Sequence, residues 1–306
     1  MLKFIKRIIV LIFTIIGLCV LLFIQSSYIV NKKYKDSFMA IIKEKYKAIN
    51  NHSHKSRIVL MVGSNSVFSI DSEKIQKELG IKVINSGLVY NVGYKFQMNF
   101  LKNYVQSGDI VVYLPEFGNY SGKGELGTAF LHRCFLYEPQ LILIAGTSNA
   151  YKFFTTGIKT ILEPIYMYVT NKSSYGIGTI NEFNIYGDHI SHLNKRSQLD
   201  KVRSYSKLTG VKISNNFIGD LDNLNSVLTS KNARLLVSFP VYSKNFVSEE
   251  LINDLDSLSF RSTLFVGNFQ NNLLEDNMFY DSPYHALNEA RDVYTENLIK
   301  IIKDAF

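Results

Sequence analysis

The sequence predicts an α/β protein built on a doubly wound, mostly parallel sheet, with one transmembrane helix at its N-terminus. Three features of the 306 residues lead to this fold class. A long apolar run near the N-terminus has the length of a membrane span. Further along, short β-branched runs alternate with segments whose apolar residues recur at helical spacing. Strands separated by helices imply right-handed βαβ units, which build parallel sheets covered by helices.

The N-terminal part divides into a short basic tail (residues 1–7) and a predicted membrane anchor (residues 8–30). From Ile8 to Ile24 the chain reads IIVLIFTIIGLCVLLFI, without a charge. Continuing to Val30 gives the roughly 20 residues that span a bilayer. Cleaved signal peptides usually have a shorter apolar core, so we expect this helix to be retained and to contact the lipid bilayer.

The orientation of the anchor depends on the charges at its two ends. Three cations precede it and three follow it, namely Lys3, Lys6, Arg7, Lys32, Lys33 and Lys35. The positive-inside count is therefore nearly balanced. The shortness of the tail favours a cytoplasmic N-terminus, which predicts a single-pass protein with an extracytoplasmic α/β domain.

The net charge of +8 is concentrated at the N-terminal end. Residues 1–57 hold 11 of the 34 Lys and Arg but two of the 26 acids, so they carry +9 and the remainder carries −1. Cations beside a membrane gain from anionic headgroups, which accounts for the excess without a nucleic-acid partner. Residues 31–56, with an amphipathic patch at Phe38, Ile41, Ile42 and Tyr46, are predicted to be a basic stalk and linker.

Residues 57–306 are predicted to form the α/β domain. The predicted strands are 57–62, 81–87, 109–115, 233–241 and 263–268, and the predicted helices are 71–79, 94–105, 221–230, 248–258 and 288–303. In parallel sheets ligands bind beyond the carboxyl ends of the strands. Residues 118–215 break the alternation and predict an insertion that caps the sheet edge, covers the site or rests on the membrane. Within it, Glu163 and Pro164 interrupt an apolar stretch at 153–169, which argues against a second membrane span.

Two segments could carry catalytic chemistry. Gly63-Ser64-Asn65-Ser66 follows the first predicted strand, where a serine hydroxyl can project beyond the sheet beside backbone N–H groups. Asp281-Ser282-Pro283-Tyr284-His285 precedes the last helix, where a carboxylate can orient an imidazole as a general base. Viewed separately, both segments are also ordinary turn sequences.

Taken together, the two segments resemble the SGNH (GDSL-like) hydrolase superfamily. The similar stretches are VGSNSVFSIDSEKI (62–75), INSGLVYNVG (84–93), GDIVVYLPEF (108–117) and FYDSPYHALNEARDVYTENL (279–298). They look like a membrane-anchored branch associated with bacterial envelope polysaccharide modification. The resemblance implies a three-layer, flavodoxin-like fold.

The resemblance also implies roles for individual residues. Ser64 would be the nucleophile, His285 its base and Asp281 the group that orients His285. The backbone N–H of Gly87, with that of Ser64 or Asn65, would form the oxyanion hole.

Some positions depart from the superfamily pattern. Val62-Gly63-Ser64 stands where Gly-Asp-Ser is usual, and the Asp-to-His spacing is four where three is commoner. The usual Gly-x-Asn block has no clear counterpart, and Glu116 lies at that strand end instead. A carboxylate donates no hydrogen bond unless protonated, so Glu116 is a candidate contact for substrate or for a neighbouring Arg. Asn65 and Asn91 are candidate replacements for the missing amide, and Asn91 a further candidate substrate contact.

No cofactor or metal is expected. Neither a Gly-x-Gly-x-x-Gly motif nor a P-loop follows the first strand. Asp188-His189 and His192 lack an apparent third ligand, so we predict a solvated loop there. Cys19 lies in the anchor, so a disulfide with Cys134 is not expected.

Two classes of function remain open from the sequence. The first is a membrane-anchored serine esterase or O-acyltransferase that acts on an acyl group of a cell-envelope glycan. The second is a non-catalytic SGNH-like scaffold that binds an envelope glycan or a membrane-bound O-acyltransferase. The degraded first and third blocks motivate the second hypothesis.

Overall fold

The computed structural model describes residues 1–51, 55–61, 63–176, 178–199, 207–261 and 263–305. A four-stranded, wholly parallel sheet has the order β2-β1-β3-β4. Its strands are β1 (Arg57–Met61), β2 (Lys82–Asn85), β3 (Ile110–Tyr113) and β4 (Arg234–Val237). Val62, the last residue of the predicted first strand, lies outside the described residues. The mixed α/β class with a parallel sheet is confirmed, while the doubly wound three-layer arrangement remains a prediction.

The central strands are buried along their whole length. Val59 of β1 is paired with Ile84 of β2 on one side and with Val111 of β3 on the other. Continuous β-branched runs of this kind suit a strand covered on both faces, because neither face has to meet water.

The predicted strand at 263–268 is reduced to a single parallel bridge between Phe265 and Val237. Val237 N–H donates to Leu264 O and Val266 N–H donates to Val237 O, both at 2.8 Å. Gly267 then has φ +82°, a conformation that turns the chain away and ends the pairing. A separate two-stranded parallel pair is formed by β5 (Tyr242–Ser243) and β6 (Leu273–Leu274).

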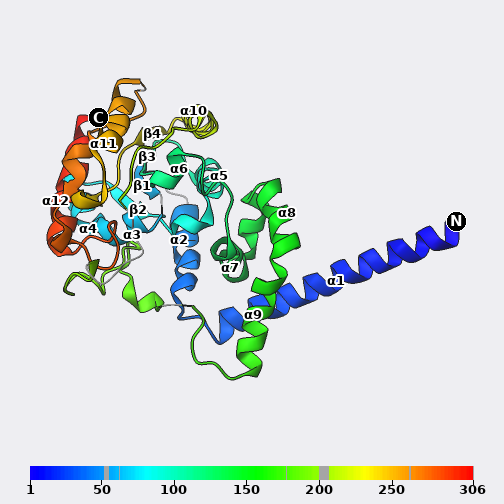
Figure 1. Ribbon diagram of the computed structural model, residues 1–306. Coiled ribbons are helices and arrows are strands. Elements are labelled where there is room, and N and C mark those ends of the chain that lie inside the picture. The colour runs from blue at the N-terminus through cyan, green and yellow to red at the C-terminus, as the bar shows by residue number, and fades with distance from the viewer. Residues whose placement is uncertain (52–54, 62, 177, 200–206, 262, 306) are drawn as a thin grey trace.

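Helices lie on both sides of the sheet (Figure 1). On one side α4 (Ser72–Leu79) contacts α12 (Asn288–Asp304), and on the other α5 (Tyr94–Tyr104) contacts α10 (Asn215–Ser230). Helix α11 (Glu249–Arg261) contacts the short helix η7 (Phe269–Asn272). Helix α4 confirms its predicted ends: Asp71 caps it by accepting from Lys74 N at 3.0 Å, and Gly80 ends it with φ +65°.

Helix α1 (Leu2–Lys32) projects far from the domain, from the side opposite α12 (Figure 1). In the described part of the chain it is the one helix long and apolar enough to cross a membrane, a test that a signal sequence would also pass. Its C-terminal turns, by contrast, belong to the fold, since Ser26, Ile29 and Val30 are buried.

Residues 31–56 differ from the predicted stalk, because much of this segment packs into the core. The short helix η1 (Phe38–Ala40) leads into α2 (Ile41–Asn50), which contacts β2. Ile42 and Ile49 are fully buried, and so is nearly all of Lys45. The amphipathic patch noted in the sequence is thus the inward face of α2, since apolar side chains at helical spacing are stabilised by burial.

Arg57 also departs from its predicted place in a basic, membrane-proximal segment. Its guanidinium is fully buried and meets the Asp109 carboxylate through two hydrogen bonds, Nε–Oδ1 at 3.0 Å and Nη2–Oδ2 at 2.6 Å. Nη1 donates to Ile49 O at 2.8 Å. Lys45 and Arg57 therefore do not contribute charge to a lipid-facing surface.

The predicted insertion at 118–215 has its helices mainly in its first half, before Thr170. Helix α6 (Phe117–Tyr120) lies at its start. It is followed by α7 (Ala129–Tyr137), η3 (Pro139–Ile144), α8 (Thr147–Thr156), α9 (Ile158–Val169) and η4 (Ile180–Glu182). Helices α7 and α9 contact α1. The apolar stretch at 153–169 is broken at Gly157, between α8 and α9, whereas Pro164 lies inside α9. Helix α9 continues through Pro164 and has 12 residues, fewer than a membrane-spanning helix needs.

Candidate active site

The segments singled out in the sequence follow the carboxyl ends of adjacent strands. After β1, Gly63 precedes helix α3 (Ser64–Ser69), so Ser64 is the first residue of that helix. After β2 come Asn85 and Gly87, and after β3 comes Glu116. Because the strands are parallel and adjacent, these residues gather at one edge of the sheet.

Asp281 and His285 lie on a tight hairpin just before α12. Phe279 and Ala286 form its antiparallel bridge, and Tyr280 N–H donates to His285 O at 2.8 Å. His285 Nδ1 lies 2.6 Å from Asp281 Oδ1. Since an ionised carboxylate only accepts, this bond places the proton on Nδ1 and leaves Nε2 as the basic nitrogen. Partial burial pushes the pKa of Asp281 upward, but the hydrogen bond and charge of His285 outweigh it and lower this pKa overall.

The hairpin packs against the last turn of α3. The ring of Phe68 stacks on His285 with a centroid distance of 3.9 Å and an interplanar angle of 14°. Ser69 Oγ donates to Tyr284 O and accepts from Ala286 N at 3.1 Å. Ser64 and Phe68 are four residues apart and share one face of α3. The fold therefore brings Ser64 to the side of α3 on which His285 lies.

Ser64 and His285 are nevertheless not directly bonded. Among the described residues, no hydrogen bond joins Ser64 Oγ to His285. The side chain of His285 keeps 16% exposure and that of Asp281 44%, so the pair is open to solvent on one side. The Asp281–His285 pair is therefore formed, whereas its contact with Ser64 remains a prediction.

Glu116 lies against the first residues of α3. A Cβ at Gly63 would collide with the Glu116 carboxyl group. The carboxyl can therefore occupy this position because residue 63 has no side chain. Glu116 is 5% exposed, and its Oε1 is buried without a hydrogen-bond partner. Burial raises the pKa of Glu116 to about 7, while the backbone N–H groups of Asn65 and Ser64 act in the opposite direction. Glu116 is thus nearly inaccessible to solvent, and its contact with a substrate remains a prediction.

The other predicted oxyanion groups are largely engaged. Gly87 N–H donates to Asn85 Oδ1 at 3.1 Å, and a Cβ at Gly87 would collide with Ser66 Oγ. The side chain of Asn65 is buried and its Oδ1 accepts from Ser66 N at 2.7 Å. Of the backbone donors predicted for an oxyanion, those of Ser64 and Asn65 face Glu116.

Asn91, the remaining candidate contact, is exposed on η2 (Tyr90–Val92). Its backbone carbonyl accepts from Thr128 N at 2.9 Å. No hydrogen bond in the described part of the chain joins its side chain to Ser64 or His285.

The prediction of a solvated loop at Asp188, His189 and His192 was wrong, because all three residues are buried. Asp188 accepts from Asn85 Nδ2 at 2.8 Å, from Ser72 Oγ at 2.6 Å and from Arg291 Nη2 at 3.2 Å. One carboxylate thus joins the end of β2, the start of α4 and helix α12 to the insertion. Little in the sequence indicated this network. A buried Asp needs hydrogen-bond donors, and when these come from distant segments no local pattern reveals them.

The two histidines extend this network to Phe68. His189 stacks on Phe68 at 4.2 Å, so the ring is held between His189 and His285. His192 Nε2 lies 2.9 Å from Ala286 O, and its Nδ1 lies 3.0 Å from His189 Nδ1. Burial lowers the pKa of His192 to about 4, so this ring is neutral near pH 7. In the described residues no group of three His, Cys, Asp or Glu could hold a metal ion.

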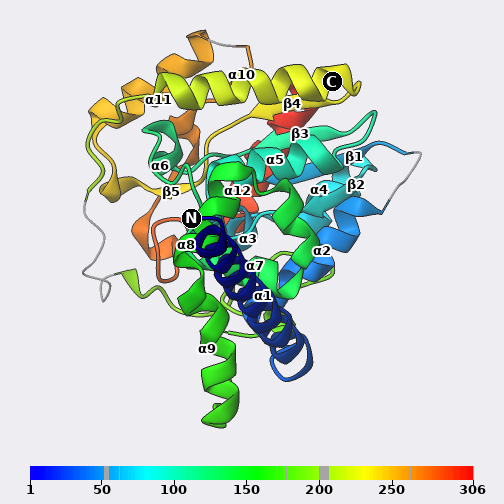
Figure 2. The same ribbon diagram turned by 90° about the vertical axis from the view of Figure 1, so that its right-hand side faces the viewer.

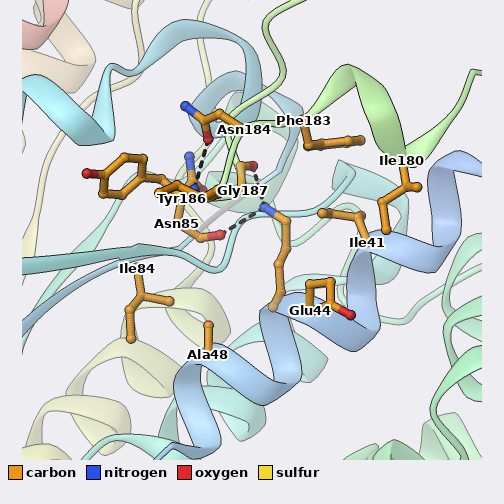
Figure 3. A pocket seen from close by; sticks show the side chains of 12 residues that line it. Ile41, Glu44, Ala48, Ile84, Asn85, Ile180, Phe183, Asn184, Tyr186 and Gly187 are labelled. Atoms are coloured by element: carbon orange, nitrogen blue, oxygen red, sulfur yellow. Dashed lines mark hydrogen bonds between the residues drawn. The ribbon is translucent and has the colours of Figure 1, made fainter.

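A cavity that sequence reasoning missed lies beside Asn85 (Figure 3). It has a volume of about 360 Å³ and is lined by α2 residues, by the end of β2 and by residues 180–187. Lys45 Nζ donates to Asn85 O at 2.8 Å and to Gly187 O at 2.9 Å. Burial lowers the pKa of Lys45 to about 7, against the attraction of Asp188. Asn85 therefore links this lysine to Ser66, whose carbonyl its amide also binds at 2.9 Å.

Comparison with family models, curated proteins and solved structures finds no match for this chain. The likeness to SGNH hydrolases therefore remains a prediction from the sequence stretches quoted above.

Proposed function

We propose that this protein is a membrane-anchored serine esterase or O-acyltransferase whose site is built from Ser64, His285 and Asp281. The observation that carries the proposal is the Asp281–His285 pair at 2.6 Å, held by Phe68 on the helix that begins with Ser64. A carboxylate, an imidazole with a free Nε2 and a serine at a helix start are the groups that acyl transfer requires.

In the proposed reaction Ser64 Oγ attacks an ester carbonyl while His285 Nε2 accepts its proton. Asp281 stabilises the imidazolium that forms. The tetrahedral intermediate expels the alcohol, which takes the proton from His285, and an acyl-serine remains. Water then releases the acid in an esterase, or an acceptor hydroxyl takes the acyl group in a transferase; His285 removes the proton in either case.

Glu116 fits this chemistry in its neutral form. A protonated carboxyl donates one hydrogen bond, and a pKa of about 7 makes that form abundant at and below neutral pH. Neutral carboxyl groups held in apolar sites are known to serve as oxyanion donors. We therefore include Glu116 as the donor that stands where the amide of the superfamily pattern is missing.

The substrate part of the proposal rests on the sequence resemblance together with α1. An acyl group on a cell-envelope glycan would be presented near the membrane, where a retained α1 would hold the domain. A membrane-bound O-acyltransferase is the protein partner that the same resemblance suggests.

A non-catalytic scaffold is the second candidate, and two observations favour it. Glu116 fills the space beside the Ser64 and Asn65 amides, and Ser64 makes no hydrogen bond to His285 in the described residues. Such a protein would keep the fold to bind an envelope glycan or an acyltransferase without turning over an ester.

Labelling by a fluorophosphonate probe separates the two candidates. The full chain in detergent is compared with Ser64→Ala and His285→Ala, and Ser230→Ala supplies an exposed serine control at the end of α10. We expect labelling to disappear in Ser64→Ala, to fall at least about 100-fold in rate in His285→Ala, and to persist in Ser230→Ala. Labelling that survives Ser64→Ala contradicts the assigned nucleophile, and a folded wild-type chain that takes no label favours the scaffold.

A further inference from the structure

The C-terminal third of α1 is built into the domain. Phe23 packs edge-on against Phe153 of α8 at 5.5 Å. Ser26 Oγ donates to Ile161 O of α9, and Ser27 Oγ donates to Leu136 O of α7 at 2.8 Å. Cleavage of α1 as a signal sequence would remove all of these contacts, so the fold itself argues for a retained helix.

These contacts begin deep within the apolar part of α1. The charged residue nearest the apolar run is Arg7, and a helix rises about 1.5 Å per residue. Cys19 therefore lies roughly 17 Å from Ile8 along the axis, whereas the hydrocarbon core of a bilayer is about 30 Å thick. If α1 spans the membrane from Ile8, the stretch from Cys19 to about Ser27 lies inside the hydrocarbon, and tilt carries it deeper.

Helix α9, which packs against this stretch of α1, has an exposed apolar surface, as a helix inside the hydrocarbon would need. On α9 an exposed stripe at helical spacing is formed by Ile158, Leu162, Tyr166 and Val169, while Ile161 and Pro164 face the protein. Figures 1 and 2 both show α9 crossing the direction of α1 beside the root of α1. A helix that lies across a membrane anchor with one apolar face outward has the arrangement of an in-plane interfacial helix.

The charges around the stripe agree with this orientation. Glu163, the acid on α9, is half-buried and bound to Arg133 at 3.0 Å, away from the exposed face. Lys159 is exposed on the same helix. Near its C-terminal end, Lys33 lies over the ring of Tyr168 at 4.9 Å. Tyrosines and lysines are the residues that settle at the level of the headgroups.

Between α1, η3 and the two insertion helices lies a small apolar cavity of about 180 Å³. Its lining consists of Cys19, Val20, Phe23, Ile142, Phe153, Ile158 and Ile161. Apolar cavities of this size exclude water and accept hydrocarbon. At the depth derived above, the hydrocarbon at hand is the acyl chain of a membrane lipid.

We propose that α9, with η3 and α8, inserts into the leaflet on the domain side of the membrane, and that the cavity beside Cys19 holds a lipid acyl chain. The occupant of the exposed stripe is thus the bilayer itself, continuous with α1. The proposal does not depend on the esterase activity, since no residue of the Ser64 site takes part in it.

Depth-dependent quenching in lipid nanodiscs tests the position of the stripe. The full chain needs replacement of Cys19 alone, because burial raises the pKa of Cys134 to about 12 and leaves it unreactive. In a Cys19→Ala background, an environment-sensitive fluorophore is attached at Leu162→Cys, at Tyr166→Cys or at Lys300→Cys, the last being exposed on α12. We expect spin-labelled lipids to quench the first two probes at least about twofold and iodide to quench only the third.

Each other outcome of this experiment contradicts the proposal. Quenching of the Leu162 and Tyr166 probes by iodide as strongly as the Lys300 probe would place the stripe in water. Protection from both quenchers that disappears on dilution to one chain per nanodisc would identify a second copy as the occupant.

Crosslinking tests the cavity independently. A lipid with a photoreactive group at the end of its acyl chain should crosslink to Ile142 and Ile158. Val20→Trp fills the cavity and should abolish these products while crosslinks to Leu162 persist. Crosslinks at Ile142 and Ile158 that Val20→Trp leaves unchanged would overturn the assignment of the cavity.

Discussion

The two ends of β3 carry two buried carboxylates that are treated in opposite ways. Asp109, just before the strand, is 1% exposed and receives both arms of Arg57 as well as Gln106 N–H at 2.9 Å. Glu116, just after the strand, is 5% exposed, faces no cation within bonding distance and has an unpartnered Oε1. The same chemical group thus has a cationic partner at one edge of the sheet, and at the other it has only backbone N–H groups and one unpartnered oxygen.

The different partners of the two carboxylates suit them to different roles, one structural and one chemical. A buried charge with a complete set of partners is fixed in one protonation state and stabilises one arrangement. A buried carboxyl without them has a displaced pKa and can change its protonation near neutral pH. The paired carboxylate lies where β1 and β3 begin, and the unpaired one lies where ligands of parallel sheets bind.

Breaking the paired carboxylate should have the largest effect on stability. Asp109→Ala leaves the Arg57 guanidinium buried without its counter-ion, which costs about 3–5 kcal/mol of unfolding free energy. The double variant Arg57→Met/Asp109→Leu should cost less, because no unpaired charge remains. Urea unfolding in detergent, followed by circular dichroism, measures both. An Asp109→Ala protein as stable as the wild type would remove the contrast between the two carboxylates.

Glu116, the carboxylate without a cationic partner, should make the free energy of unfolding depend on pH. Its folded-state pKa of about 7 lies above the unfolded value of 4.5, so Glu116 stabilises the fold below pH 4.5 and loses that contribution as pH rises through 7. Relative to Glu116→Gln, the wild type should lose about 2.5 kcal/mol between pH 5 and pH 8. Unfolding curves of both proteins across this range provide the measurement. Parallel pH profiles would show that Glu116 has an ordinary pKa.

Lys45 should also make the stability depend on pH, but in the direction opposite to Glu116. Its folded-state pKa of about 7 lies below the unfolded value of 10.5, so the unfolded chain binds more protons between these values and stability rises with pH. The wild type should gain about 2 kcal/mol relative to Lys45→Met between pH 7 and pH 8.5. Thermal unfolding at several pH values distinguishes this from a lysine that stays charged, for which the difference between the two proteins would not change with pH.

A partly exposed carboxylate should matter least. Asp71 accepts from Lys74 N at 3.0 Å as the cap of α4 and meets Arg291 at 3.2 Å, with 24% of its side chain exposed. Asp71→Ala should cost about 1 kcal/mol, whereas Asp71→Asn, which keeps the capping oxygen, should cost less. Equal losses in the two variants would mean that the ion pair with Arg291, not the cap, is what Asp71 contributes.

Local patterns in the sequence were sufficient for much of the architecture. The charge-free run from Ile8 predicted α1, the β-branched runs predicted the four paired strands, and Asp71 with Gly80 predicted both ends of α4. These features follow from residues close together in the chain, because capping, helical spacing and strand periodicity are short-range properties. The pairing of Asp281 with His285 belongs to the same class, since a single hairpin brings the two side chains together.

What only the tertiary structure decided is which polar residues are buried and with what partners. The sequence predicted Arg57 as the start of a strand at the basic end of the chain and Asp188 as part of a solvated loop. In the fold, Arg57 is buried against Asp109, and Asp188 meets Arg291 across 103 positions of the chain. The burial of the Glu116 carboxyl against Gly63 is likewise a result of the tertiary fold. A charged side chain is buried only where distant segments supply its hydrogen bonds, and no local pattern encodes which segments will meet.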